Sequence, residues 1–324
     1  STNQDLVYVT DQFLYSNDPS KFVTATYNSN KTYHAIVFEQ EDTLNFLPKM
    51  DSEPDGYDYE GHIITGVSDE AKNKLPQADR IGNTYVELLS ASIGNGSANF
   101  PQDNDGVIRR APTAIYFEGA DHVYPSLVMS AVIDILGIKK NGGFDYDFEN
   151  NYLNLIDTTD TIVRQIPIDD KGRMYVNYYG MFQTFYYLPY SYCMDPEMLP
   201  PDYWQDKVAF VGASLPGLMD LRNTPVQETF AGVEIHANVM HSILQDSFVQ
   251  VRDSSSTFYT ILLICLVMGI TISFPKKPFY ALPIPIIAIV GWFIYANFQF
   301  ATNLVMLEVV RPILSVIGTF GGIF

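Results

Sequence analysis

The sequence predicts an extracytoplasmic α/β domain, built on a mixed and largely parallel sheet with an antiparallel part, followed by three transmembrane helices. Three observations predict this fold class. Strand patterns alternate with amphipathic helix patterns through residues 1–256, nearly all charged residues lie in that part, and three long apolar stretches follow it. The predicted domains are therefore residues 1–256 and residues 257–324.

Short apolar segments, several of them separated by turn-forming residues, predict the strands. The predicted strands are 34–39, 62–67, 84–89, 107–110, 113–117, 152–156, 162–168, 173–178 and 208–211. We expect 113–117 to pair with 107–110, and we expect 152–156 and 162–168 to form a hairpin. Segment 208–211 is apolar throughout, which is typical of a buried parallel strand.

Two amphipathic helices are predicted in the same part of the chain. The first runs to about residue 136 and has Ser126 or Tyr124 as its N-cap. The second covers about 232–245 and carries an apolar stripe. We expect the second helix to pack on the sheet that contains strand 208–211.

The distribution of charge excludes several classes of protein. Of 19 basic and 37 acidic residues, only Lys276, Lys277, Arg311 and Glu308 follow residue 256, which leaves residues 1–256 with a net charge of −20. Such a surface repels phosphate backbones, so no nucleic-acid partner is expected. An aromatic content of 14% argues against disorder, and two cysteines exclude a disulfide scaffold.

The C-terminal part predicts three membrane spans, at residues 258–274, 279–297 and 304–324, because a bilayer core needs about 20 apolar residues as a helix. Lys276 and Lys277 lie between the first two spans and place that loop in the cytoplasm. The acidic domain then lies outside, and the protein is a multi-pass protein of the inner (cytoplasmic) membrane. The polar linker 252–256 reaches less than ~20 Å, so the domain is expected close to the outer leaflet.

Two charged residues fall inside the third predicted span. Glu308 and Arg311 are three residues apart, so on a helix they would share a face. One interpretation is a self-neutralising pair near the membrane interface. The other is an interhelical contact that transmits a signal. The chain is apolar to Phe324, so we expect further chain beyond it.

The remaining motifs do not form a catalytic constellation. Asp51, Glu53 and Asp55 have the spacing of a calcium loop, but His62 stands where that loop needs Glu, and a solvated acidic loop is the alternative. Segment 208–214 is a strand leading into a glycine turn, without a phosphate-binding motif. The histidines lack metal-ligand spacing. We therefore predict neither enzymatic activity nor a cofactor.

Five motifs in order resemble the CHASE type-2 domain, a cyclase/histidine-kinase-associated sensory extracellular domain. Residues 103–112 resemble its D-x-D-G-V-x-R-x-x-P motif, and residues 124–127 its Y-P-S-L helix start. Residues 172–180 resemble G-x-M-x-x-N-Y-x-G, and its closing block is similar to segments 207–214, 217–220, 224–225 and 232–238. Family members usually begin with a span and a W-P-W-P-R-like segment, so we expect chain before Ser1 as well.

The resemblance implies a bacterial extracytoplasmic sensor, usually followed by three spans and a cytoplasmic cyclase or kinase. Arg109, Tyr124, Asn177 and Asp220 stand in family-like motifs, and one hypothesis is that they converge on a ligand-binding cleft. The alternative is that Arg109 pairs with Asp220 or another acid to hold the fold. The leading function is a membrane-anchored sensor that forms homo-oligomers or contacts other membrane or cell-surface proteins. The alternative function is a scaffolding subunit of a membrane assembly without a small ligand.

Overall fold

The computed structural model describes residues 19–39, 49–50, 53, 57, 59–82, 85–193, 195, 197–200, 202–213, 221–252, 254–274 and 281–323. The chain divides into two compact units, Ser1–Asp246 and Ser247–Phe324. This division lies N-terminal to residue 256, where the sequence places the boundary. The reason is that a short strand preceding the first apolar helix belongs to the second unit.

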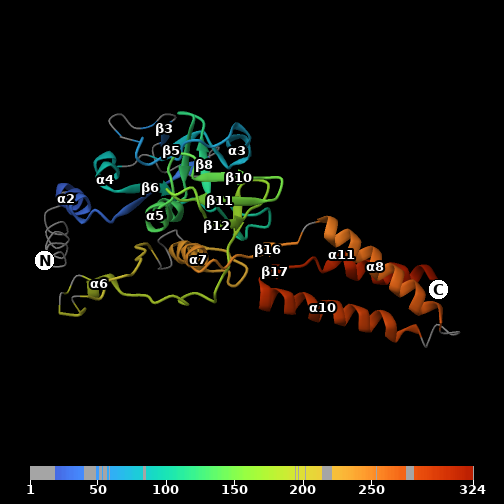
Figure 1. Cartoon of the computed structure of the whole chain (residues 1–324). Helices are drawn as coiled ribbons and strands as arrows, with labels where there is room; N and C mark the ends of the chain where they lie inside the picture. The colour runs from blue at the N-terminus through green and yellow to red at the C-terminus, as the bar shows by residue number, and fades with distance from the viewer. Residues whose placement is uncertain are drawn as a thin grey trace. The chain divides into compact units, whose positions relative to one another are not determined.

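The first unit combines short helices with many short strands (Figure 1). Its helices are α2 (Pro19–Ser29), α3 (Asp69–Lys74), α4 (Val86–Ala91), α5 (Leu127–Leu136), α6 (Tyr190–Cys193) and α7 (Gly232–Leu244). Its strands are β1 (Tyr33–Ile36), β2 (Phe38–Glu39), β3 (Lys49–Met50), β4 (Gln77–Ala78), β5 (Arg80–Gly82), β6 (Gly94–Ser97), β7 (Arg110–Pro112), β8 (Ala114–Phe117), β9 (His122–Pro125), β10 (Phe144–Asp147), β11 (Tyr152–Ile156), β12 (Ile162–Pro167), β13 (Arg173–Tyr175), β14 (Leu221–Arg222) and β15 (Phe230–Ala231).

These strands form several small sheets instead of the single, largely parallel sheet that the sequence predicts. Only the pairs β1–β6 and β4–β8 are parallel among the described strands of this unit. The antiparallel pairs are β2–β5, β3–β5, β8–β9, β10–β11, β11–β12, β7–β13 and β14–β15. The fold class is therefore mixed α/β, and the prediction of a largely parallel sheet is wrong.

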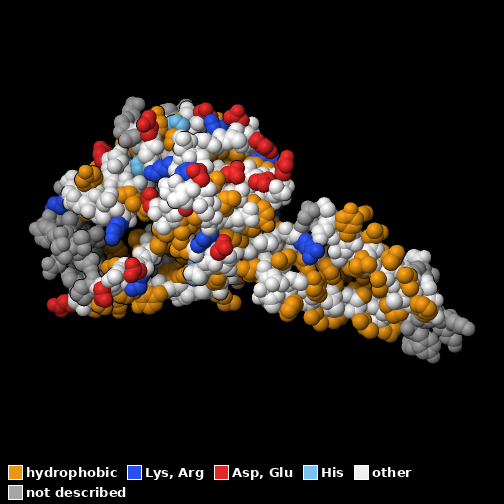
Figure 2. Space-filling model, viewed as in Figure 1, with side chains coloured by type: hydrophobic (Ala, Val, Ile, Leu, Met, Phe, Trp, Pro, Cys, Tyr) orange, Lys and Arg blue, Asp and Glu red, His pale blue; other side chains and the backbone are white. Residues whose placement is uncertain are grey.

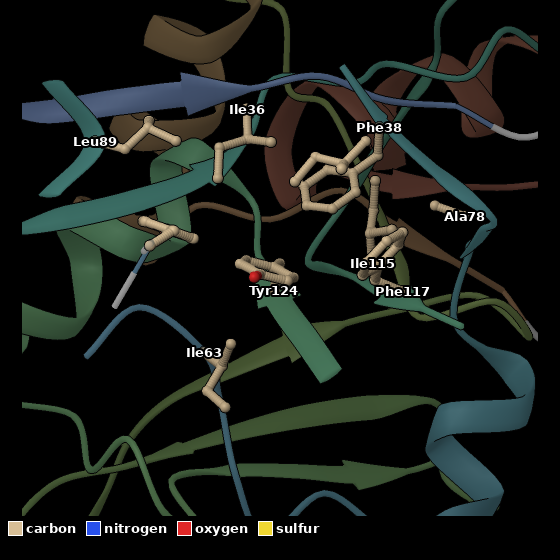
Figure 3. Packing of buried hydrophobic residues seen from close by; sticks show 10 residues of the cluster. Ile36, Phe38, Ile63, Ala78, Leu89, Ile115, Phe117 and Tyr124 are labelled. Carbon is tan, nitrogen blue, oxygen red and sulfur yellow. The ribbon is translucent and has the colours of Figure 1, made fainter. Parts of the chain in front are cut away.

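The core lies where these small sheets meet (Figure 3). Phe38 packs against Phe117 and Tyr124, with ring centroids 5.9 and 5.0 Å apart. Ile36 from β1 and Ile115 from β8 join the same cluster. Strands β1, β2, β8 and β9 are too short to bury much surface alone, so burial of these large side chains holds the sheets together.

Helix α5 and strand β6 show how closely the elements approach one another. Ser126 caps α5 by accepting a hydrogen bond from the backbone of Met129, and Gly137 ends it in the left-handed conformation, at φ 67°. A Cβ atom at Gly96 would lie 2.6 Å from the carbonyl oxygen of Ser126. Glycine is therefore required there, because any side chain would push β6 away from the start of α5.

Several sequence predictions of local structure are confirmed and others are wrong. Segments 126–136, 152–156, 162–168 and 232–245 correspond to α5, β11, β12 and α7. Residues 86–89 of the predicted strand 84–89 lie in helix α4, because a short apolar run does not distinguish a strand from a helix. Segment 62–67 is a turn with single bridges, and Gly66 has a φ of 72°. Segment 113–117 corresponds to β8. It pairs with β4 and β9, and not with segment 107–110 as predicted.

The predicted strand at 208–211 is also wrong. These residues form no ladder with any described strand, and Val208 and Val211 are 47% and 86% exposed. An apolar run becomes a buried strand only where neighbouring strands supply hydrogen bonds and cover it. Helix α7 consequently packs on α5 and β15, and not on a sheet built from 208–211.

The second unit consists of helices α8 (Ser254–Ser273), α10 (Pro283–Asn303) and α11 (Val310–Ile323), with strands β16 (Gln250–Val251) and β17 (Val305–Met306). Met268, Ile272, Ala281 and Val316 form its buried core. Strands β16 and β17 are parallel, and the backbone amide of Arg252 donates to the carbonyl oxygen of Met306 at 3.1 Å. This ladder joins the segments that lead into α8 and α11.

The described residues contain two helices that are long and apolar enough to cross a membrane, Ser255–Ser273 and Pro283–Asn303. The prediction of three spans is therefore not confirmed. The third predicted segment, 304–324, begins with β17, and α11 is only 14 residues long, against the ~20 residues of a typical span. Figure 2 shows apolar side chains over α8 and α10, and acidic side chains on the surface of the first unit. Lys276 and Lys277 lie outside the described residues.

Candidate functional site

The buried carboxylate of Glu53 is hydrogen-bonded to two side chains of strand β9. His122 and Tyr124 lie two residues apart on β9, so their side chains share a face. The hydroxyl of Tyr124 donates to Oε1 of Glu53, and Nδ1 of His122 lies 2.7 Å from the same oxygen. Burial, together with the Glu53 carboxylate, raises the pKa of Tyr124 well above its ordinary value. The hydroxyl therefore stays protonated and remains a hydrogen-bond donor.

The D-x-D-G-V-x-R segment forms a charge network with the strand that follows it. Asp103 accepts from both Arg109 and Arg110, at 3.2 and 3.1 Å. Asp105 pairs with Arg109 at 2.7 Å, and these hydrogen bonds lower the pKa of Asp105 to about 2. The guanidinium groups of both arginines are thus paired with carboxylates. The network therefore stabilises the turn before β7 and leaves no unpaired arginine to bind a ligand.

Asp169 extends the network to β13. It lies 2.7 Å from Nη2 of Arg173 and 3.6 Å from Nε of Arg110. Arg110 also donates to the hydroxyl of Tyr175 at 2.8 Å, and its guanidinium lies over the ring of that residue. These contacts lock the register of β7 on β13.

The four residues that the sequence suggests for a ligand cleft have different surroundings. Arg109 belongs to the charge network, and Asn177 lies on the adjoining segment, where Val176 donates to the carbonyl oxygen of Arg109 at 2.9 Å. Tyr124 lies in the core and binds Glu53. Asp220 lies outside the described residues, as do Asp51 and Asp55 of the calcium candidate. The third member of that candidate, Glu53, already accepts from Tyr124.

Sequence reasoning assigned no role to Glu234, which is 2% exposed in the first turns of α7. Its carboxylate accepts hydrogen bonds from the backbone amides of Gln183 and Thr184, both at 2.9 Å, and from the hydroxyl of Tyr187 at 3.0 Å. Asn238, one turn later, accepts from the amide of Tyr179 at 3.0 Å. A Glu four residues before an Asn on a helix with an apolar stripe was the available signal, because both side chains lie on one face.

His236 lies between these two residues in sequence and has an apolar environment. Its ring centroid is 4.4 Å from that of Phe100 and 6.3 Å from that of Phe210. Burial lowers the pKa of His236 to about 4, so the side chain is neutral at pH 7. Through Phe210, this cage anchors segment 208–211 to α7.

The end of α7 is held by a side chain from the hairpin. Arg164 of β12 donates from Nε to the carbonyl oxygen of Ile243 at 2.7 Å, and from Nη2 to that of Leu244 at 3.0 Å. The last carbonyls of a helix lack partners within the helix and carry partial negative charge. The guanidinium therefore satisfies them and fixes the point where the chain leaves the first unit.

At the start of α11, Arg311 and Glu308 form an ion pair, with Nε and Oε1 2.9 Å apart. Glu308 precedes the helix, so the pair closes the turn into α11 and does not lie along a helix face as predicted. Trp292 of α10 donates from Nε1 to the carbonyl oxygen of Glu308 at 3.2 Å. The pair thus connects the segment before α11 to α10.

Comparison with known proteins identifies the family. The CHASE2 domain model matches residues 17–272, which is most of the chain. The chain belongs to the CHASE2 domain family. CHASE2 is an extracellular sensory domain of signalling proteins, so a sensory role is consistent with the resemblance seen in the sequence. Neither the curated proteins nor the solved structures contain a match.

Proposed function

We propose that this chain is a membrane-anchored, extracytoplasmic sensory module of a bacterial signalling protein, without catalytic activity of its own. Its location would be the cytoplasmic membrane, which it would cross more than once. The observation that carries the proposal is CHASE2 membership in a chain whose acidic unit is followed directly by two helices able to cross a membrane. Lys276 and Lys277, between those helices in sequence, support an orientation with the acidic unit outside.

The chain path offers a route for a signal. Helix α7 ends at Leu244, whose carbonyl oxygen Arg164 holds, and β16 begins at Gln250. Strand β16 is hydrogen-bonded to β17, and the two strands lead into α8 and α11. Displacement of the C-terminal end of α7 would therefore act on the starts of both helices together and not on α8 alone.

The two native cysteines test the topology. Cys193 belongs to the first unit and Cys265 lies in α8. A membrane-impermeant maleimide added to intact cells in which the outer membrane has been permeabilised should label Cys193 and leave Cys265 unlabelled. Labelling of Cys193 only after the cytoplasmic membrane is opened would contradict the extracytoplasmic placement.

A fusion tests the sensory role itself. We include α11 in the proposal as a third crossing, which places Phe324 in the cytoplasm. A histidine kinase domain joined after Phe324 should then change its autophosphorylation when components of the external medium are varied. A flexible Gly-Ser insert after Asp246 should abolish that response while the first unit stays folded, because it separates α7 from β16. An unchanged response with the insert would contradict the route through β16.

A second candidate function has its own observation. Segment 179–211 exposes many large apolar side chains on the first unit, at Tyr179, Met181, Tyr186, Tyr190, Tyr192, Met198, Trp204, Val208 and Val211. Tyr and Trp are enriched at protein interfaces. A scaffolding subunit that contacts other membrane or cell-surface proteins, or a second copy of itself, would use this surface. Cross-linking through Cys193, which lies within it, would report such a contact.

A further inference from the structure

Two adjoining cavities in the second unit share a wall formed by Trp292 and Tyr295. The larger, of about 210 Å³, is lined by apolar side chains of all three helices, including Ile264, Ala288 and Val316. The smaller, of about 150 Å³, is lined by the polar side chains of Arg252, Thr257, Thr260 and Glu308 and by the apolar side chain of Leu307. Together they form a groove with one apolar part and one polar part.

The polar part lies at the helix starts. Arg252 lies two residues before the first residue of α8, Glu308 lies two residues before that of α11, and the β16–β17 ladder holds these two segments side by side. The apolar part extends along α8 to Ile264, about 10 Å beyond Thr257 at 1.5 Å per residue. Polarity along the groove therefore changes from headgroup-like to hydrocarbon-like over the depth that an acyl chain occupies at a membrane surface.

Arg252 supplies a positive charge at the polar part. Glu308 is neutralised by Arg311, at 2.9 Å. The side chain of Arg252 donates from Nε to Ser256 at 2.6 Å, and among the described residues no carboxylate lies within 4.0 Å of it. A guanidinium presents several donors in one plane and binds phosphate oxygens through two of them at once.

We propose that this groove binds one anionic phospholipid, with its phosphate on Arg252 and one acyl chain in the apolar cavity beneath Trp292. The inference rests on the proposed membrane location. Trp292 is fixed by its hydrogen bond to the carbonyl oxygen of Glu308. Its ring separates the headgroup region from the acyl region, because it lines both cavities. Occupancy would stabilise the arrangement in which β16 and β17 are paired.

Glycine positions offer matched variants. A Cβ atom at Gly291, which lines the apolar cavity, meets no atom within 4 Å, so Gly291→Leu fills the groove without a clash at its Cβ. Gly269 on α8 is equally open and does not line the groove, so Gly269→Leu is the control. Both changes raise helix propensity by similar amounts.

Trp292 itself reports the lipid. The chain has two tryptophans, so a Trp204→Phe background leaves Trp292 as the single tryptophan, which is excited selectively at the red edge of protein absorption. The full chain is reconstituted in vesicles of brominated phosphatidylglycerol or brominated phosphatidylcholine mixed with unbrominated lipid. Quenching should show a preference for phosphatidylglycerol of about tenfold, the usual contribution of a charged hydrogen bond. Arg252→Gln should abolish the preference, and Gly291→Leu should reduce quenching several-fold relative to Gly269→Leu.

The inference would be overturned by equal quenching by the two lipids, by an unchanged preference in Arg252→Gln, or by equal quenching in the two leucine variants. Displacement of the brominated lipid by soluble glycerol phosphate would also overturn it, because the acyl chain would then contribute nothing. Carbonate extraction of the same membranes separates this inference from the proposed function. A chain that is released by carbonate contradicts the membrane location, whereas a retained chain without lipid preference contradicts the groove alone.

Discussion

Helices α7 and α8 are both rich in apolar residues, but they differ in side-chain burial: α7 buries even polar side chains, whereas α8 leaves large apolar ones exposed. Helix α7 buries Glu234, His236 and Asn238, and backbone amides of segment 179–184 donate hydrogen bonds to Glu234 and Asn238. Helix α8 exposes Leu262 and Leu263 to 57% and 61%. A helix in water covers its apolar stripe, whereas a helix in lipid has no reason to do so. The comparison teaches that the surrounding medium, and not the composition of the helix, decides which side chains must be covered.

The largest expected effect comes from removing the carboxylate that α7 buries. Glu234→Ala should destabilise the first unit by about 4 kcal/mol, because several buried donors lose their acceptor at once. Thermal unfolding of the full chain in detergent, followed by near-ultraviolet circular dichroism, measures this change. Glu228→Ala, at an exposed position just before α7, is the control and should stay within about 0.5 kcal/mol of the parent. Equal effects of the two changes would mean that Glu234 does not hold segment 183–187.

Acidification should weaken α7 through His236. Its pKa is lowered to about 4 in the folded state, against about 6.5 in an unfolded chain. Between these values the unfolded state binds more protons, so stability falls as pH falls from 6.5 to 4, by roughly 3 kcal/mol at most. His236→Phe keeps an aromatic ring between Phe100 and Phe210 and should remove this part of the pH dependence. Parallel stability curves for parent and variant between pH 4 and 6.5 would contradict the buried neutral histidine.

A lysine on α8 tests the apolar medium directly. Leu263→Lys, near the middle of α8, should oppose membrane insertion by about 2.5 kcal/mol. The matched control is Ile135→Lys on α5, since Ile135 is 47% exposed in the first unit. That change should alter the stability of the first unit by less than about 0.5 kcal/mol. Carbonate extraction measures the first effect and thermal unfolding the second. If Leu263→Lys inserts as well as the parent, α8 does not face lipid.

The smallest effect is expected at the exposed end of the charge network. Arg109→Gln should lower stability by about 0.5 kcal/mol, because Arg109 and Asp105 lie at the surface, where solvent screens the pair. Arg173→Gln should cost more, since Arg173 and Asp169 are 12% and 14% exposed. Thermal unfolding of the two variants in one buffer compares them. An equal or larger loss of stability in Arg109→Gln would contradict the expectation that the exposed Arg109–Asp105 pair stabilises the fold less than the Arg173–Asp169 pair.

Local patterns in the sequence were sufficient where an element depends mainly on its own residues. Helix α5 has a cap at Ser126 and a glycine stop at Gly137, and the β11–β12 hairpin pairs as predicted, with one register shift between Leu155 and Ile156. Family-like motifs likewise marked the segments around Arg109 and Glu234. The long-range partners of Arg110 and Glu234 could not be predicted, because Asp169 and Thr184 lie far from them in sequence, and only the folded chain brings them together.

The sequence by itself determined the division into an acidic part and an apolar part, the helices α5 and α7, and the two long apolar helices, because each follows from composition or short-range periodicity. Only the tertiary structure decided the rest. Strand β6 has the sequence Gly-Asn-Gly-Ser and little strand propensity, and it forms because it pairs with β1 and lets α5 approach closely. Segment 208–211 shows the reverse: its sequence predicts a strand, but no described strand pairs with it, and it does not form one. Backbone hydrogen bonds need a neighbour, and a neighbour is a property of the whole fold.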